Sequence, residues 1–389
     1  MGTTKMMDPS KLKEMCKMRV EVLHPDYEIV EIVAGGEYLY DPQVFWDWNP
    51  DSVWGQPDGS ILISDIGGQQ QAGWDPAMGH GAIYRLHADN KVETILAPGV
   101  GRQAGIFRPI IAPHGWGEWA GHIFFCSQII PGRRGAIVDH MVYRIGPGDT
   151  KPHGVGIPPR SGRHGGGISG ALLPGVFGRA GTPEEGLFLF FSMHNTTIYA
   201  MRPDLSIEPW IVLDGADGNP GPVMPYRLYY ADSNIVGEDN VLVIDGKWGA
   251  SFGGEATHAY TSGQFRVVGR NVLPEAIRSL AGGPTLRAPK GFGPLAGQYF
   301  RPENHGFISS VHWTAAEREA LPYSAEIVRR DSDGNEHVFA TNLQAGQNLI
   351  GFTADRMIIT NLRHSYSSGD FHEPDGSIYA IQYKGAKSL

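Results

Sequence analysis

The sequence predicts an all-β protein, a six-bladed β-propeller preceded by a short helix. Its 389 residues include 53 Gly and 28 Pro, about a fifth of the chain against roughly 12% in average proteins. So many helix-breaking residues exclude a long-helix or coiled-coil protein. Hydrophobic residues make up 41% of the chain and aromatic residues 10%, which is enough for a large core and excludes wholesale disorder.

An internal repeat gives the number of blades. The pattern apolar-Tyr-x-apolar recurs about every 60 residues. Its copies are residues 83–86 (IYRL), 142–145 (VYRI), 198–201 (IYAM) and 378–381 (IYAI), with a weaker copy at Tyr260 and a degenerate one at 327–329. Each follows a run rich in Ile, Val and Phe, which is typical of strands. Six small sheets packed around one axis fit this period, and seven blades are the less favoured alternative.

A second repeat supports a common blade design. Residues 112–121 (APHGWGEWAG) match residues 288–297 (APKGFGPLAG) at six of ten positions, and both precede a β run. We interpret them as tight turns between strands, in which glycine supplies positive φ. Asp65 and Asp245, at the ends of β runs, are interpreted as turn formers as well.

The first 24 residues depart from the repeat. Asp8 as an N-cap and Pro9 at the first helical position predict a short helix. We therefore expect a helical extension over residues 1–24 and a single propeller domain over residues 25–389.

Charge and cysteine content limit the partners and the compartment. The 32 Lys and Arg against 41 Asp and Glu give a net charge of −9, which disfavours nucleic acid and anionic membranes as partners. No apolar run approaches the ~20 residues that span a bilayer, and no signal peptide is evident. Cys16 and Cys126 form no disulfide framework. We expect a cytoplasmic protein that acts on a small molecule, and its oligomeric state stays open.

The candidate site follows from the predicted architecture, since propellers bind ligands where the inner strands of the blades begin. Histidines there are proton shuttles, because imidazole titrates near physiological pH, and arginines orient anionic substrates. Oxygen ligands suit Ca²⁺, whereas imidazoles suit Zn, Fe, Cu or Ni. The catalytic candidates are His164, His305, Arg108 and Arg227; the substrate-binding candidates are Tyr226, Gln347, Asn348 and Trp54; the metal candidates are Asn49, Asp51, His114 and His194.

Residues 53–66, with Val53-Trp54 and the turn Pro57-Asp58-Gly59, and then residues 83–86, resemble the first blade of the SMP-30/gluconolactonase/strictosidine-synthase-like propellers. The resemblance implies six blades and, for many members, a calcium- or zinc-dependent lactonase or esterase. Two positions depart from the family's metal-binding pattern: residues 49–52 (NPDS) stand where a Glu is expected, and residues 225–227 (PYR) replace a Pro-Asp-Gly entrance. The resemblance therefore supports the fold more than the lactonase chemistry.

We expect a lactone or ester hydrolase in which a metal- or base-activated water attacks the carbonyl. The metal is Ca or Zn, with Fe or Mn as alternatives. A lyase, isomerase or oxygenase with a histidine-bound transition metal is a second hypothesis, and residues 304–309 (NHGFIS) are faintly similar to a strand of carotenoid-cleavage oxygenases. A non-catalytic propeller that binds a protein partner is a third, and carbon–carbon bond formation of the strictosidine-synthase type stays open.

Overall fold

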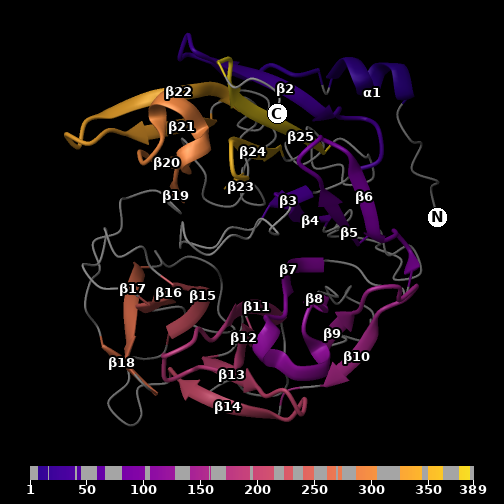
Figure 1. Cartoon of the computed structure of the whole chain (residues 1–389), viewed down its shortest axis with the longest axis vertical. Helices are drawn as coiled ribbons and strands as arrows, with labels where there is room; N and C mark the ends of the chain where they lie inside the picture. The colour runs from indigo at the N-terminus through magenta and orange to yellow at the C-terminus, as the bar shows by residue number, and fades with distance from the viewer. Residues whose placement is uncertain are drawn as a thin grey trace. The chain divides into compact units, whose positions relative to one another are not determined.

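The computed structural model describes the parts of the chain that form its sheets. These are residues 8–15, 17–39, 42–44, 59–65, 81–100, 106–127, 141–156, 158, 172–192, 196–213, 223–230, 240–248, 261–268, 270–273, 286–304, 325–343, 349–361 and 376–385. Within them the protein is mostly β, with few helices and several small antiparallel sheets (Figure 1), as predicted. None of the helices in these ranges has the length and hydrophobicity of a bilayer-spanning segment.

The chain packs as two compact units, each with three sheets in its described part. Unit 1 is Met1–Gly105 with Leu280–Leu389, and unit 2 is Ile106–Ser279. Unit 1 contains α1 (Pro9–Met15), η4 (Lys290–Leu295), β1 (Glu21–Val22), β2 (Tyr27–Val33), β3 (Pro42–Val44), β4 (Ile61–Asp65), β5 (Ala82–Leu86), β6 (Val92–Leu96), β19 (Leu286–Arg287), β20 (Tyr299–Asn304), β21 (Ala325–Arg330), β22 (Glu336–Leu343), β23 (Leu349–Phe352), β24 (Arg356–Asn361) and β25 (Ser377–Tyr383). Unit 2 contains η3 (His114–Trp119), β7 (Ile106–Ile111), β8 (Ile123–Ser127), β9 (Val142–Ile145), β10 (His153–Gly156), β11 (Leu172–Phe177), β12 (Phe188–Ser192), β13 (Thr197–Met201), β14 (Ile207–Val212), β15 (Val223–Tyr230), β16 (Leu242–Trp248), β17 (Thr261–Val268) and β18 (Asn271–Leu273).

Four of the sheets are uninterrupted antiparallel meanders, namely β3–β6, β7–β10, β11–β14 and β15–β18. The other two borrow a strand from the N-terminal segment: β2 pairs with β25, and β1 pairs with β22. Strands from the start and end of the chain therefore share two sheets of unit 1. The predicted extension over residues 1–24 contributes one of these strands, after a helix whose Asp8 carboxylate accepts from the Ser10 N–H at 2.8 Å.

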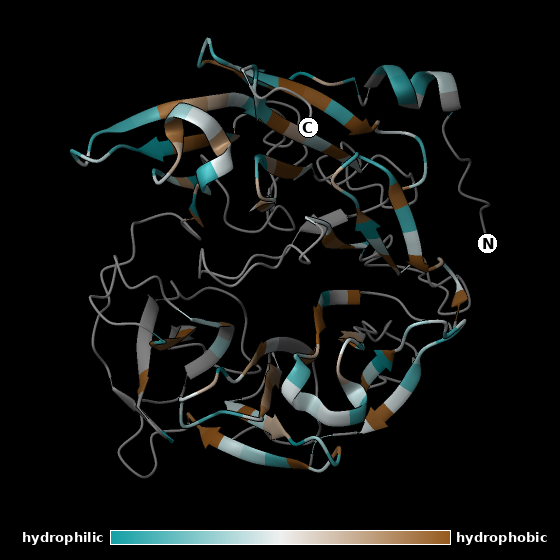
Figure 2. Ribbon diagram, viewed as in Figure 1, coloured by the Kyte–Doolittle hydropathy of each residue, from teal (hydrophilic) through white to brown (hydrophobic). Residues whose placement is uncertain are grey.

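The periodic tyrosines occupy equivalent places. Tyr84, Tyr143, Tyr199 and Tyr379 all lie in the third strand of a sheet, opposite Ile63, Phe125, Phe190 and Ile359 of the second strand. All four are buried, which confirms their interpretation as packing residues. The outer strands β6 and β22 instead contain hydrophilic as well as hydrophobic residues (Figure 2). Their exposed positions are consecutive, Glu93 and Thr94 in β6 and residues 336–338 in β22, so part of each strand is solvated.

The two ten-residue repeats form the same turn between the first and second strands of their sheets. In each, the N–H of the first alanine donates to the carbonyl oxygen of the residue ten positions later. Ala112 donates to His122 and Ala288 donates to Gln298, both at 2.8 Å. Gly117 and Gly293 both have positive φ, 58° and 74°. This confirms the prediction of tight turns in which glycine supplies the left-handed conformation.

Each of these turns inserts an aromatic ring against the first strand of the next sheet. Trp116 of η3 packs on Phe177, the last residue of β11, with ring centroids 4.7 Å apart. Phe292 of η4 packs on Phe352, the last residue of β23, at 5.0 Å. Trp116 is 1% exposed and Phe292 is fully buried. The repeated sequence therefore codes for an aromatic contact between neighbouring sheets.

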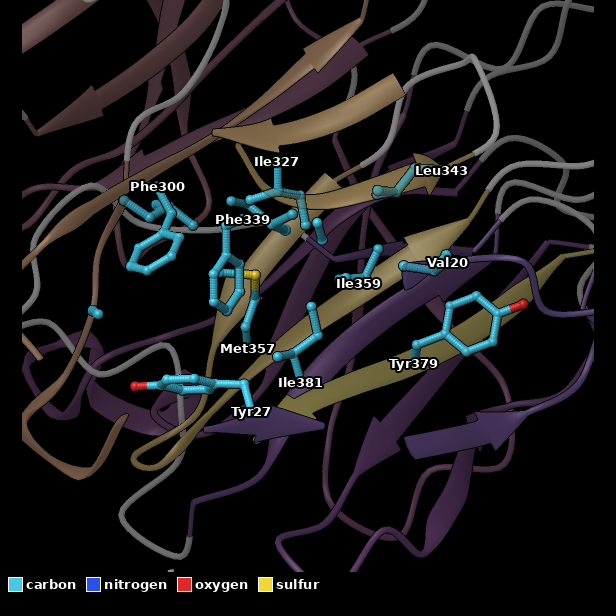
Figure 3. Packing of buried hydrophobic residues seen from close by; sticks show 14 of the residues in the cluster. Val20, Tyr27, Phe300, Ile327, Phe339, Leu343, Met357, Ile359, Tyr379 and Ile381 are labelled. Carbon is cyan, nitrogen blue, oxygen red and sulfur yellow. The ribbon is translucent and has the colours of Figure 1, made fainter. Parts of the chain in front are cut away.

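The contact made by η4 belongs to a larger apolar cluster (Figure 3). Side chains of β20, β21 and β22 interleave there with those of β2, β24 and β25, so the cluster joins two sheets of unit 1. The Tyr27 hydroxyl donates to the carbonyl oxygen of Phe292 and accepts from the Leu295 N–H. A strand from the start of the chain thus fixes the position of the η4 turn.

The turn between β11 and β12 makes a polar version of the same contact. Its Glu184, 3% exposed, accepts a hydrogen bond from the hydroxyl of Tyr230, the last residue of β15, at 2.7 Å. The same hydroxyl accepts from the Arg179 N–H at 3.1 Å, and the Arg179 guanidinium lies 4.2 Å from the Tyr230 ring centroid. Burial, and then the charge of Glu184, raise the pKa of Tyr230 well above its usual range. The hydroxyl therefore keeps its proton and remains a donor to Glu184.

Replacing Trp116 tests the aromatic contact. We expect Trp116→Ala to lower the free energy of unfolding by about 3–5 kcal/mol, because the cavity it leaves lies between two sheets. Denaturant unfolding measures the loss. Leu23→Ala, at a position 48% exposed, is the matched control and should change stability by no more than about 0.5 kcal/mol. A loss below about 1 kcal/mol for Trp116→Ala would contradict the packing role.

Replacing Tyr230 tests the polar contact. We expect Tyr230→Phe to lower the free energy of unfolding by about 1–3 kcal/mol, because the buried Glu184 carboxylate loses its hydroxyl donor. Glu184→Gln keeps an acceptor oxygen for that hydroxyl and should therefore lower the free energy of unfolding by a smaller amount. Equal stability of Tyr230→Phe and the unmodified chain in urea unfolding would show that the hydrogen bond contributes nothing.

Candidate functional site

The first strands of the three sheets of unit 2 share an irregularity. β11 contacts both β7 and β15 (Figure 1), so the three strands are neighbours. In each, the pairing with the second strand slips: between Phe107 and Ile110, between Pro174 and Val176, and between Pro225 and Arg227. A proline lies at each slip, as expected, because proline lacks the N–H of a regular ladder and is confined to edges and bulges. Bulges re-aim side chains and are common beside active sites.

Arg108 lies at the β7 bulge in a backbone conformation that arginine rarely adopts. Its φ is +44°, in the left-handed region that favours glycine. It also precedes Pro109, which restricts it further. The side chain is partly buried. Non-glycine residues held in this region concentrate at functional sites, where the surrounding fold maintains the strain. Among the predicted site residues that the structure describes, Arg108 is the one with a positive φ.

Tyr226 and Arg227 lie within β15, at its bulge, rather than ahead of the strand as the sequence suggested. Tyr226 is the extra residue, since Pro225 pairs with Gly246 and Arg227 pairs with Asp245. The β7 and β15 bulges thus contain three of the predicted residues, and both strands flank β11. Eight other predicted residues lie outside the described ranges: Asn49, Asp51, Trp54, His164, His194, His305, Gln347 and Asn348.

His114 lies away from the start of its sheet. It is exposed at the first position of η3, the turn that follows β7, so it sits at the opposite end of the sheet from Ile106. In the first sheet of unit 1, the first strand is Pro42–Val44, so Asn49 and Asp51 follow that strand in sequence instead of preceding it. No group of three or more His, Cys, Asp or Glu side chains that could hold a metal occurs in the described part of the chain. His114, the one metal candidate that the structure describes, belongs to no such group among the described residues.

The interpretation of Asp65 and Asp245 as turn formers is wrong. Both are strand residues: Asp65 pairs with Pro42 and Ala82, and Asp245 pairs with Arg227 and Gln264. Asp65 is fully buried. Charged residues are rarely buried unless they are paired. This carboxylate is therefore a candidate functional-site residue that the sequence analysis missed.

The missed signal lies in the register of the second strands. In four sheets the second strand carries a small polar residue at the same position, two residues beyond the one opposite the periodic tyrosine. These residues are Asp65 and Asn361 in unit 1, and Ser127 and Ser192 in unit 2. The charge of Asp65 also acts on Tyr38, which is partly exposed. Burial raises the pKa of Tyr38 most, followed by the negative charges of Glu37 and Asp65. An apolar run that ends repeatedly in Asp, Ser or Asn was the available clue.

The strain at Arg108 can be measured by substitution. In an ordinary strand position Ala is more stabilising than Gly by roughly 0.5–1 kcal/mol. At Arg108 we expect the opposite order, with Arg108→Gly more stable than Arg108→Ala by about 1 kcal/mol, because only glycine adopts positive φ without steric cost. Urea unfolding of the pair gives the difference. The same pair at Thr94, an exposed residue of β6, should show the ordinary order, and the ordinary order at both positions would exclude strain at Arg108.

Comparison with known proteins shows a likeness to solved propeller enzymes at low identity. No family model and no curated protein matches the chain. A gluconolactonase from Xanthomonas campestris is 11% identical, with 94% of this chain and 95% of that one covered and a TM-score of 0.45. An α-L-arabinofuranosidase from Fusarium graminearum is 11% identical, with 90% and 94% covered and a TM-score of 0.48. A glucose dehydrogenase is 10% identical, with 91% and 98% covered and a TM-score of 0.44. These scores assign no activity to the chain.

Proposed function

We propose that the protein is a six-bladed β-propeller enzyme that hydrolyses a lactone or an ester, and that Arg108 binds its substrate. The observation that carries the proposal is the left-handed backbone of Arg108 at the β7 bulge. A fold maintains such a conformation against its cost where the side chain must point in one direction. The proposal of a closed propeller is supported by the six small sheets and by the period of the tyrosines.

Arginine at this place suits a substrate with a carboxylate or an oxyanion. The guanidinium stays charged at all physiological pH values and presents several N–H donors in a fixed plane. Held on a rigid strand, these donors can bind a substrate carboxylate or stabilise the charge that develops on a carbonyl oxygen under attack. Arg227, at the β15 bulge, is proposed for the same task.

The remaining roles are proposals from residue chemistry. In the reaction, water adds to the ester carbonyl, the acyl C–O bond breaks, and an acid and an alcohol are released, or a hydroxy acid from a lactone. His164 or His305 is proposed to accept the proton of the attacking water. Tyr226, Trp54, Gln347 and Asn348 are proposed to line the substrate site. A divalent ion held by Asn49 and Asp51 is a proposal from their oxygen donors, and no step is assigned to it.

Activity measurements on the full-length protein test the proposal. We expect turnover of a panel of γ- and δ-lactones and aryl esters, with a preference for substrates that carry a carboxylate. Arg108→Ala should lower kcat/KM by about 10²–10³-fold, the loss typical of a donor to developing charge. Arg108→Lys, which keeps the charge without the planar fork, should recover part of it.

The control is Leu205→Gly, because Leu205 also has positive φ, 64°, but lies in the turn between β13 and β14. It should leave kcat/KM unchanged. Dialysis against a chelator, followed by addition of Ca²⁺, Zn²⁺, Mn²⁺ or Fe²⁺ singly, tests the metal. The hydrolase proposal fails if the panel shows no turnover, and the role of Arg108 fails if Arg108→Ala keeps full kcat/KM.

A further inference from the structure

An indole bridges two sheets of unit 2 at the end of the η3 turn. Trp119 donates its Nε1–H to the carbonyl oxygen of Pro203 at 2.8 Å. Trp119 belongs to the connection between β7 and β8, whereas Pro203 lies in the turn between β13 and β14. This hydrogen bond therefore ties the β7–β10 sheet to the β11–β14 sheet.

Arg144 and His122 hold the indole in place. The Arg144 guanidinium carbon lies 4.2 Å from the centroid of the Trp119 ring, in a cation–π contact. The same guanidinium has Nη1 3.2 Å from Nδ1 of His122, whose ring packs edge-on against Trp119 with centroids 5.5 Å apart. A guanidinium has no acceptor, so His122 Nδ1 accepts and the ring is neutral in this arrangement. A Cβ at Gly146 would lie only 2.4 Å from the His122 ring, so the imidazole also rests against backbone.

The charged groups around His122 favour its neutral form. Burial, and then the Arg144 guanidinium, lower the pKa of His122, and His153 acts in the same direction. Asp149 and Glu118 act against them. Asp149 is itself engaged, with Oδ2 3.8 Å from Arg144 Nη1 and 3.4 Å from His153 Nε2. The two carboxylates thus only partly offset the positive charge that a proton on His122 would meet.

We propose that Trp119, Arg144 and His122 form a proton-sensitive latch between these two sheets. While His122 is neutral, it accepts from Arg144, keeps the guanidinium over Trp119 and so maintains the bond to Pro203. A proton on Nδ1 removes the acceptor and places a second positive charge beside Arg144. The guanidinium then leaves the indole, and the Trp119 to Pro203 bond opens more often.

The direction with pH follows from proton linkage. A histidine whose pKa is lower in the folded state binds fewer protons there than in the unfolded chain. Its stabilising contribution is therefore present above the unfolded pKa of about 6.5 and is lost as the pH falls below that value. The latch is closed at neutral pH and weakened under mildly acidic conditions.

Hydrogen exchange at the Trp119 indole of the full-length protein tests the latch. The indole signal is assigned from its loss in Trp119→Phe, and exchange rates are divided by those of N-acetyl-tryptophanamide at each pH. We expect the corrected rate to rise about tenfold between pH 7.5 and 5.5 in the unmodified chain. His122→Gln, which keeps an acceptor but cannot be protonated in this range, should show no such rise.

His337→Gln is the matched control, since His337 contacts the Asp331 carboxylate at 3.0 Å in unit 1, and it should behave like the unmodified chain. Equal pH dependence in the unmodified chain and in His122→Gln overturns the proposal. Should His122→Gln not fold, NMR titration of the His122 ring in the unmodified chain decides. A pKa below about 6.5 supports the latch, and a value at or above it overturns the latch.

Discussion

The contact between one sheet's first turn and the end of the next sheet's first strand is the interaction on which this structure depends. A small antiparallel sheet has two apolar faces and cannot bury both by itself. Trp116 on Phe177 and Phe292 on Phe352 solve this problem with aromatic rings. Glu184 on Tyr230 solves it with a buried hydrogen bond. These contacts fix how neighbouring sheets pack, and the first strands of the sheets, including the bulged ones, are held at defined positions as a result.

The bulged first strands combine two tasks. An edge strand with regular N–H and C=O groups invites pairing with another strand, and proline and bulges prevent this. In unit 2 the same irregularities bring Arg108 into a left-handed conformation and make Tyr226 the extra residue of β15. The device that blunts the edges therefore also creates the unusual geometry on which the proposed hydrolase site is based. The η3 turn that carries Trp116 also makes a polar contact between sheets, from Trp119 to Pro203, and we propose that its strength depends on the charge state of His122.

Local signals in the sequence gave much of the fold. Glycine and proline content, the period of the tyrosines and the paired ten-residue turns led to small antiparallel sheets with equivalent packing residues, and the structure has them. The candidate site was less accessible. Asp65 was misinterpreted because an aspartate after an apolar run has the same local pattern whether it ends a strand or forms a turn. Asp65 pairs with Pro42 and Ala82, which lie roughly 20 residues before and after it in the chain. No local sequence pattern encodes that register.

The sequence by itself determined the class of secondary structure, the repeat and the turns, because these depend on backbone preferences and side-chain alternation over a few residues. Only the tertiary structure decided which residues are strained, buried or joined across sheets. Arg108 has positive φ because β7 bulges against β8 ahead of a proline, and Trp119 meets Pro203 because two sheets pack together. Such relations arise from contacts between segments far apart in the chain, where burial and packing override local preference.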